Sequence, residues 1–173
     1  MGLLVKEGLE KDWFVLKFKR FYRKVWLSEP DFKSNKLQEH IKLLDKLAPG
    51  YVLDYKVNDS TQEDWHTYID YRIVPGTPAV EFEPTKEFIN KIQNFYLLSL
   101  QQYKPYAHWD WSLSNILIDG DNMQLIDWDN VSIFSVDQVF VQMNMILRDG
   151  FSKADLADIF IPKETIAKYM GNV

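Results

Sequence analysis

Four polar side chains stand at spacings that could support proton transfer and metal binding. His108, Asp110 and Asn115 fit the pattern H-x-D-x-x-x-x-N, and Asp127 follows inside the run LIDWD. A carboxylate can accept a proton or hold Mg²⁺, which prefers oxygen ligands, and an Asn amide adds a neutral oxygen ligand without charge repulsion. The residue types therefore suit a proton acceptor placed beside a metal site.

The surrounding segment, HWDWSLSNILIDGDNMQLIDWDN, brackets a DGDN turn with two apolar runs, NILI and MQLI. We predict that the runs pair as a short hairpin, which returns Asp127 to the neighbourhood of Asp110 and Asn115. The alternative is an acidic loop that only caps helices and turns, where Asp and Asn are favoured. Since a chance H-x-D-x-x-x-x-N arises in about one chain in a hundred of this length, we favour a functional site.

These motifs resemble the catalytic and metal-binding loops of the aminoglycoside phosphotransferase and choline kinase group, the small-molecule branch of the protein-kinase-like fold. The resemblance implies that His108 and Asp110 belong to a catalytic loop, in which Asp110 accepts the proton of the acceptor hydroxyl. It implies that Asn115, Asp127 and Asp129 bind Mg²⁺. ATP or GTP is then the nucleotide, and a small molecule, such as a sugar, amino sugar or amino alcohol, receives its γ-phosphate.

Weaker matches extend the resemblance to the nucleotide site. Lys17 in FVLKF matches the lysine that contacts the nucleotide phosphates, with Lys19 and Arg20 as rivals if the strand phase is different. Glu39 on the following helix is its expected partner. The resemblance also implies that adenine binds backbone groups at the end of a strand, in the residues Asp70, Tyr71, Arg72 and Ile73.

The elements that must position these residues follow from hydrophobic periodicity. We predict strands at 3–5 and 13–18 joined as a hairpin, a helix marked by Leu37, Ile41, Leu44 and Leu47, and an antiparallel strand pair in YVLDYKV and WHTYIDYRIV. Helical spacing returns between Pro84 and Pro105 and in DQVFVQMNMILRD. Two short helices, started by Ser152 and Pro162, are expected to close the chain.

The expected fold class is α+β, a minimal form of the two-lobe protein-kinase-like fold. Residues 1–76 form a β-rich lobe with a small antiparallel sheet and one helix, and residues 77–173 form a mostly helical lobe with the catalytic and metal-binding loops. Only Gly2 and Gly8 precede Lys17, so we expect the Gly-rich phosphate loop and the first strand of the family to be missing.

The short C-terminal lobe leaves a second hypothesis open, a catalytically inactive kinase-like module that binds a nucleotide or a partner. Retention of Asp110, Asn115 and Asp127 favours the enzyme, because converging oxygen-rich side chains repel one another without a metal. An open acceptor side is also compatible with a homodimer in which the second subunit completes the site.

Composition narrows the remaining classes. The net charge of −5 and pI near 5.2 argue against a nucleic-acid partner, and the basic strip KFKRFYRK (Lys17–Lys24) is interpreted as a solvated edge. An RNA-binding protein using this strip would need an RNA module that is not recognisable here. The chain has no Cys, no apolar run near the roughly 20 residues that span a bilayer, and no secretory-type start. We therefore expect a cytoplasmic protein without a membrane partner.

The tryptophans at 109, 111 and 128 admit two interpretations. Aromatic residues of this size most often belong to the core. Alternatively, they line a pocket that attracts a cationic substrate through cation–π contacts.

Overall fold

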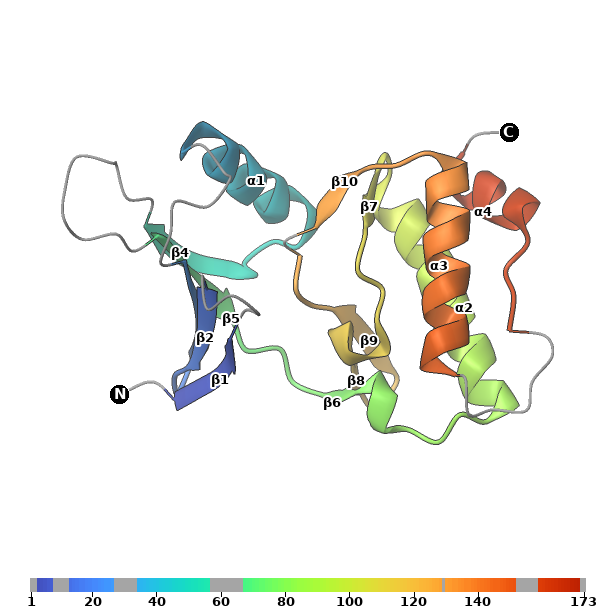
Figure 1. The fold of residues 1–173 in the computed structure, drawn as a ribbon, viewed down its shortest axis with the longest axis horizontal. Coiled ribbons are helices and arrows are strands. Elements are labelled where there is room, and N and C mark those ends of the chain that lie inside the picture. The colour runs from blue at the N-terminus through green and yellow to red at the C-terminus, as the bar shows by residue number, and fades with distance from the viewer. Residues whose placement is uncertain are drawn as a thin grey trace. The chain divides into compact units, whose positions relative to one another are not determined.

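The computed structural model describes residues 3–7, 13–26, 34–56, 67–128, 130–151 and 159–171. Contacts divide the chain into two compact units, Met1–Ile73 and Val74–Val173, called here the N-terminal and C-terminal units (Figure 1). The described residues form antiparallel sheets and four α-helices, which confirms the α+β class. Among these residues, no helix is both long and apolar enough to cross a membrane.

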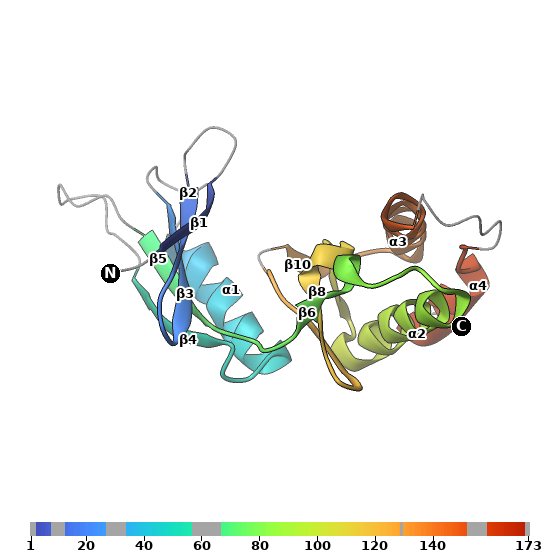
Figure 2. The ribbon, with the colours of Figure 1, turned by 90° about the horizontal axis from the view of Figure 1, so that it is seen from below.

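The N-terminal unit is built on a five-stranded antiparallel sheet in the order β1-β2-β3-β5-β4. Its strands are β1 (Leu3–Glu7), β2 (Trp13–Lys17), β3 (Phe21–Trp26), β4 (Val52–Lys56) and β5 (Thr67–Arg72). The helix α1 (Ser34–Leu47) lies beside the sheet (Figure 2). The predicted hairpin of the first two strands, the helix and the β4–β5 pair are confirmed.

The core of this unit follows from two periodicities. Leu37, Ile41 and Leu44 recur at helical spacing and are at most 4% exposed, so α1 buries one face. On β5, Ile69 and Tyr71 are also buried. Residues two apart on a strand point to the same side of a sheet, so Ile69 and Tyr71 belong to one face of the sheet and Asp70 to the other.

The third strand corrects the interpretation of the basic strip as a solvated edge. β3 pairs with β2 on one side and with β5 on the other, so half of the strip is an inner strand. Lys19 and Arg20 form the turn before it, in which Phe18 N donates to Phe21 O at 2.9 Å. This strand was not predicted from the sequence, because Arg23 and Lys24 interrupt the apolar and aromatic residues around Val25.

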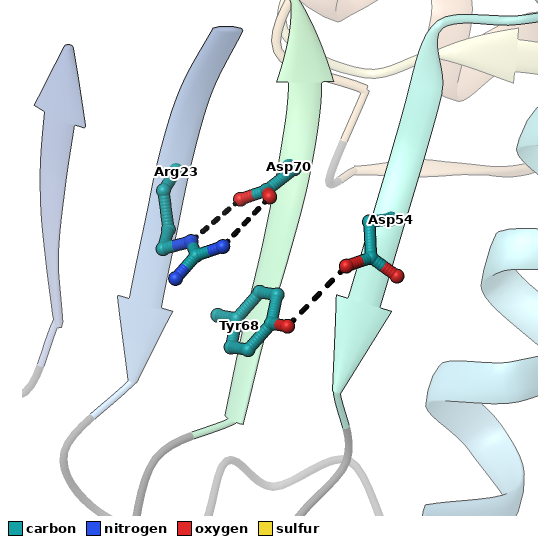
Figure 3. Close-up of polar contacts among 4 residues, drawn as sticks. All are labelled: Arg23, Asp54, Tyr68 and Asp70. Carbon is teal, nitrogen blue, oxygen red and sulfur yellow. Dashed lines mark hydrogen bonds and ion pairs between the residues drawn. The ribbon is translucent and has the colours of Figure 1, made fainter. Parts of the chain in front are cut away.

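A salt bridge explains how a cation is tolerated on an inner strand. Arg23 donates from Nε and Nη2 to the two carboxylate oxygens of Asp70 at 2.7 and 2.8 Å, from a directly opposite position on β5 (Figure 3). Its guanidinium carbon lies 3.9 Å from the ring centroid of Tyr68, and Tyr68 donates to Asp54 at 3.3 Å. The hydrogen bond with Asp70 raises the pKa of Arg23, so the guanidinium stays charged.

The C-terminal unit combines three α-helices with short strands. Its elements are β6 (Thr77–Pro78), the 3₁₀ helix η1 (Ala79–Glu81), α2 (Lys86–Tyr103), β7 (Tyr106–His108), the 3₁₀ helix η2 (Leu113–Asn115), β8 (Ile116–Asp119), β9 (Asn122–Leu125), β10 (Val131–Ile133), α3 (Val136–Gly150) and α4 (Lys163–Met170). Three of the four helices predicted for this unit are confirmed, including the last one after Pro162. The helix expected from Ser152 falls outside the described residues.

The helices of this unit begin and end at residues suited to those positions. The Thr85 hydroxyl accepts from Phe88 N at the start of α2, and Ser135 and Gln138 form a reciprocal capping box at the start of α3. Gly171 ends α4 with a φ of 76°, a left-handed conformation that glycine adopts without strain. α4 packs against both α2 and α3.

A buried tyrosine joins α2 to the segment that carries the candidate site. Tyr96 is fully buried, and its hydroxyl donates to the backbone carbonyl of Trp111. Burial raises the pKa of Tyr96 above its ordinary value of 10.0, and the negative charge of Asp110 acts in the same direction. Tyr96 therefore keeps its proton, and its hydrogen bond, over the physiological pH range.

We predict that Asp70→Asn lowers the free energy of unfolding by about 2 kcal/mol, because it replaces charge-assisted hydrogen bonds to a buried carboxylate. Urea denaturation of both proteins measures the difference. Asp54→Asn is the matched control on the neighbouring strand: its carboxylate is exposed, so its effect should stay within about 0.5 kcal/mol. Equal losses in the two variants would contradict the importance given to the Arg23 pair.

A second prediction concerns alkaline pH. Because the pKa of Tyr96 is raised in the folded state, its contribution to stability is complete below pH 10.0 and is lost as the pH rises further. Tyr96→Phe should be about 1 kcal/mol less stable than wild type near neutral pH, and the gap should close by about pH 11. Urea denaturation at both pH values measures it, with Tyr55→Phe as an exposed control. A gap that stays constant with pH would contradict the prediction.

Candidate active site

The β8–β9 hairpin connects the two loops of the candidate site, the loop with Asp110 and Asn115 before β8 and the loop with Asp127 after β9. Ile116 pairs with Leu125 and Asp119 with Asn122, and Gly120 occupies the turn with a φ of 59°. The predicted pairing of NILI with MQLI is therefore confirmed. At its open end, Ile126 N donates to Asn115 O at 2.9 Å, so Asp127 follows directly after a residue bonded to Asn115.

A second strand pair, which the sequence analysis missed, joins the flanks of the same two loops. β10 pairs with β7, with Val131 opposite His108, and Trp109 N donates to Asn130 O at 2.7 Å. The chain entering the Asp110 loop is thus bonded to the chain leaving the Asp127 loop. Both strands have only three residues, too few for a periodicity to identify.

Asp110 and Asn115 are in direct contact. Asn115 Nδ2 donates to Asp110 Oδ2 at 2.8 Å and to the Asp110 carbonyl at 3.3 Å, and Ser112 N lies 3.3 Å from Asp110 Oδ1. A carboxylate accepts hydrogen bonds and does not donate them, so the NH₂ side of the amide must face Asp110. The Asn115 amide oxygen is then the atom left for a metal ion.

The His108 side chain is buried and contacts the backbone of the Asp127 loop. Its side chain is 1% exposed, and Nε2 lies 3.1 Å from the carbonyl of Ile126, the residue before Asp127. A carbonyl can only accept, so Nε2 carries a proton in this contact. Its ring also meets the ring of Trp128 edge to face, at 5.0 Å between centroids. The geometry suits a residue that positions the Asp127 loop, and its place in the catalytic loop stays a prediction.

Asp127 has an unusual backbone conformation. It is half-buried and has a φ of 61°, the one positive value among the described residues other than glycine. Such conformations carry a strain of about 1–3 kcal/mol for most residues and concentrate at functional sites, although Asp is among the side chains that tolerate them best. Asp129, the third expected metal ligand, falls outside the described residues.

The donor set fits Mg²⁺, which takes carboxylate, amide and water oxygens. Within the described ranges, no group of three or more His, Asp or Glu side chains is arranged to hold a metal ion. Asn115 and Asp127 could therefore supply only part of an octahedral shell. Phosphate oxygens and water would complete it, as is usual for Mg²⁺ in nucleotide sites.

Two of the three tryptophans in the segment belong to the core. Trp111 and Trp128 are at most 1% exposed, and Trp128 Nε1 donates to the Leu125 carbonyl at 2.9 Å. Trp109 is half-buried and stacks on Phe134, with 4.3 Å between ring centroids. A cation–π pocket made by all three is therefore excluded.

The residues expected to contact the nucleotide phosphates lie in the N-terminal unit. Lys17 is exposed at the end of β2, with Nζ 5.6 Å from the ring centroid of Tyr22, and Glu39 is exposed on α1. Among the described residues, no ion pair joins Lys17 to Glu39. The structure does not bring these two residues together.

The residues expected to bind adenine lie in and just after β5. Asp70 and Tyr71 are paired with β3 and β4 on either side, and Arg72 N donates to Tyr51 O at 2.8 Å. The Asp70 side chain is held by Arg23. Ile73 follows the strand, in a segment without regular structure. Of these residues, Ile73 is therefore the one whose backbone lies outside the sheet ladder.

The structure also identifies a candidate that the sequence analysis missed. Three strands precede α1, so the expectation of a missing first strand was wrong. Lys24 lies on the third strand, opposite Ile69 and Val15, and so on the same face of the sheet as the buried Ile69, away from the face of Arg23 and Asp70. Lys19 and Arg20 form the turn between β2 and β3, so Lys17 ends the second strand and Lys24 lies on the strand that precedes α1. A prediction of this turn from the sequence would have pointed to Lys24.

No family model matches the chain, and no curated protein matches it in sequence. Solved structures do. The bifunctional kinase-methyltransferase WbdD superposes with a TM-score of 0.59 at 13% identity, over 94% of this chain and 42% of WbdD. WaaP, solved in complex with acyl carrier protein, superposes with a TM-score of 0.62 at 11% identity, over 100% of this chain and 79% of WaaP.

A co-crystal structure of WbdD with the kinase inhibitor LY294002 matches with a TM-score of 0.54 at 14% identity, over 94% of this chain and 43% of WbdD. The chain thus spans less than half of the WbdD chains that it matches. At these identities the likeness concerns the fold alone. The chain shares its α+β fold with WaaP and with part of WbdD.

Proposed function

We propose that this protein is a Mg²⁺-dependent phosphotransferase that moves the γ-phosphate of ATP or GTP to a hydroxyl of a small molecule. The observation that carries the proposal is the contact of Asp110 with Asn115, at 2.8 Å, in a loop bonded through its backbone to the residue before Asp127. The residues proposed as proton acceptor and as two of the metal ligands thereby belong to one hydrogen-bonded part of the chain. The acceptor class is a sugar, an amino sugar or an amino alcohol.

In the proposed reaction, Asp110 accepts the proton of the acceptor hydroxyl. The hydroxyl oxygen forms a bond to the γ-phosphorus, and the bond from that phosphorus to the bridging β–γ oxygen breaks, leaving the nucleoside diphosphate. Asn115, through its amide oxygen, and Asp127 are the proposed Mg²⁺ ligands, together with Asp129. Bound Mg²⁺ supplies charge neutralisation for the phosphates.

The remaining side chains of the site have supporting roles in this proposal. His108 holds the carbonyl of Ile126 and so fixes the start of the Asp127 loop. The Asn115 amide keeps the Asp110 carboxylate in one orientation. Both contacts fix catalytic groups before the substrate binds, which lowers the reorganisation needed during transfer.

For the nucleotide phosphates we propose Lys24 in preference to Lys17. The resemblance places the phosphate lysine on the strand that leads into the helix, and β3 is that strand. Arg23 points to the opposite face, where Asp70 holds it. Glu39 on α1 and the backbone from Ile73 onward remain the proposed partners for the lysine and for adenine.

Asp110→Asn should reduce phosphoryl transfer by about 10²–10⁴-fold while nucleotide affinity persists, because the variant keeps the size of the side chain and loses the base. The assay uses labelled ATP, with slow ATP hydrolysis followed alongside, against a panel of sugars, amino sugars and amino alcohols. Asp121→Asn, an exposed residue in the turn of the same hairpin, is the matched control and should transfer at the wild-type rate.

Asp127→Asn provides the second arm of this test. It should weaken nucleotide binding measured by calorimetry with Mg²⁺, since the metal and the phosphates share ligands. If the wild type binds nucleotide yet neither transfers nor hydrolyses above the level of Asp110→Asn, the protein is an inactive kinase-like module. Equal nucleotide affinity with and without Mg²⁺ would contradict the metal assignment.

The lysine assignment gives a separate prediction. Lys24→Met should weaken Mg²⁺–nucleotide binding or transfer by about tenfold or more, because a positive charge at the phosphates is lost. Lys17→Met and Lys19→Met should stay within about twofold of wild type. Calorimetry and the transfer assay measure all three, with circular dichroism to verify folding. Damage from Lys17→Met with a neutral Lys24→Met would restore the assignment made from the sequence.

A further inference from the structure

One end of the sheet in the N-terminal unit gathers exposed cations. Lys17 ends β2, and Lys19 and Arg20 form the turn to β3; all three are exposed. Arg72 is also exposed and lies at the same end, because it pairs with Phe21, the first residue after the turn. We call these four cations the basic end. From this end of the sheet the chain continues beyond β5 toward β6 (Figure 2).

The turn that carries the basic end is stiffened by aromatic stacking. The rings of Phe18 and Phe21 lie 4.5 Å apart between centroids, at an interplanar angle of 16°. The guanidinium carbon of Arg23 lies 5.7 and 5.6 Å from the same two ring centroids, and Asp70 holds Arg23 in place. The cations of the turn are therefore presented from a fixed support.

The cations of the basic end, Lys17, Lys19, Arg20 and Arg72, have no ion-pair partner among the residues that the structure describes. This concentration of positive charge stands on a protein whose net charge is −5. Such a local field attracts an anionic surface while the rest of the molecule is repelled, which favours one orientation of approach.

Exposed leucines lie beside these cations. Leu3 is 69% exposed and pairs directly with Lys17, and Leu4 is 49% exposed and pairs with Leu16. Peripheral membrane binding typically combines apolar side chains that enter the headgroup region with Lys and Arg that meet anionic headgroups. A nucleic acid would satisfy the cations and leave the leucines in water.

We propose that the basic end, with Leu3 and Leu4, docks the protein on an anionic lipid surface. The expectation of no membrane partner rested on the lack of a spanning segment, and peripheral docking needs none. The proposal is independent of the phosphotransferase activity, since it uses neither Asp110 nor its neighbours.

Sedimentation with lipid vesicles tests the proposal directly. The full chain should co-sediment with vesicles of phosphatidylcholine and phosphatidylserine in equal amounts and stay in solution with phosphatidylcholine alone. Binding should weaken as salt is raised, because the attraction between exposed charges is screened. An absence of binding to the mixed vesicles, or equal binding to both kinds, would overturn the proposal.

Charge reversal identifies the surface. The double variant Lys19→Glu/Arg20→Glu should lower partitioning by about 25-fold or more, at roughly fivefold for each cation lost. Lys86→Glu/Lys168→Glu makes the same change in net charge at exposed sites of the C-terminal unit and is expected to bind nearly as wild type. Leu3→Ser should weaken binding while keeping its salt dependence. Circular dichroism verifies the fold of each variant.

Two outcomes would show that the basic end does not dock the protein on lipid. Equal losses in the two double variants would mean that net charge, and not the basic end, governs binding. Retention of a short single-stranded oligonucleotide, lost in Lys19→Glu/Arg20→Glu, with no vesicle binding, would identify a nucleic-acid surface instead. Either result overturns the lipid proposal.

Discussion

The hydrogen bond from Ile126 N to Asn115 O closes the β8–β9 hairpin and fixes the candidate site. The placement of Asp127 relative to Asn115 depends on it, and the pairing of β7 with β10 acts alongside it. The hydrogen bond places Asp127 beside the residue that orients Asp110, and His108 reinforces it by holding the Ile126 carbonyl. Because the hairpin loop is short, this arrangement costs little loop-closure entropy and needs few contacts from the rest of the unit.

Local signals allowed this hairpin to be predicted from sequence. Two apolar runs and the DGDN turn between them specify both strands and the turn without knowledge of distant residues. The same holds for α1, whose buried positions recur at helical spacing. The helix after Pro162 could also be predicted, because proline starts it and Gly171 ends it.

The features that could not be predicted from the sequence depend on contacts between residues far apart in the chain. Arg23 and Lys24 suggested a solvated strip, yet β3 is an inner strand. Arg23 is tolerated there because Asp70, which is 47 residues away, neutralises its charge. β7 and β10 are too short to show a period, and only their mutual pairing defines them. The contact of His108 with the Ile126 carbonyl could not be predicted either, because the two residues lie 18 positions apart. The choice between Lys17 and Lys24 as the proposed phosphate lysine depends on the number of strands before α1, which the sequence alone did not indicate.

A crystal structure with a non-hydrolysable ATP analogue and Mg²⁺ tests the central claim most directly. The account predicts a metal ion bound by the Asn115 amide oxygen, the Asp127 carboxylate and phosphate oxygens, with the Asp110 carboxylate facing the γ-phosphate. A nucleotide bound away from Asp110, or a metal ion whose ligands include neither Asn115 nor Asp127, would contradict it.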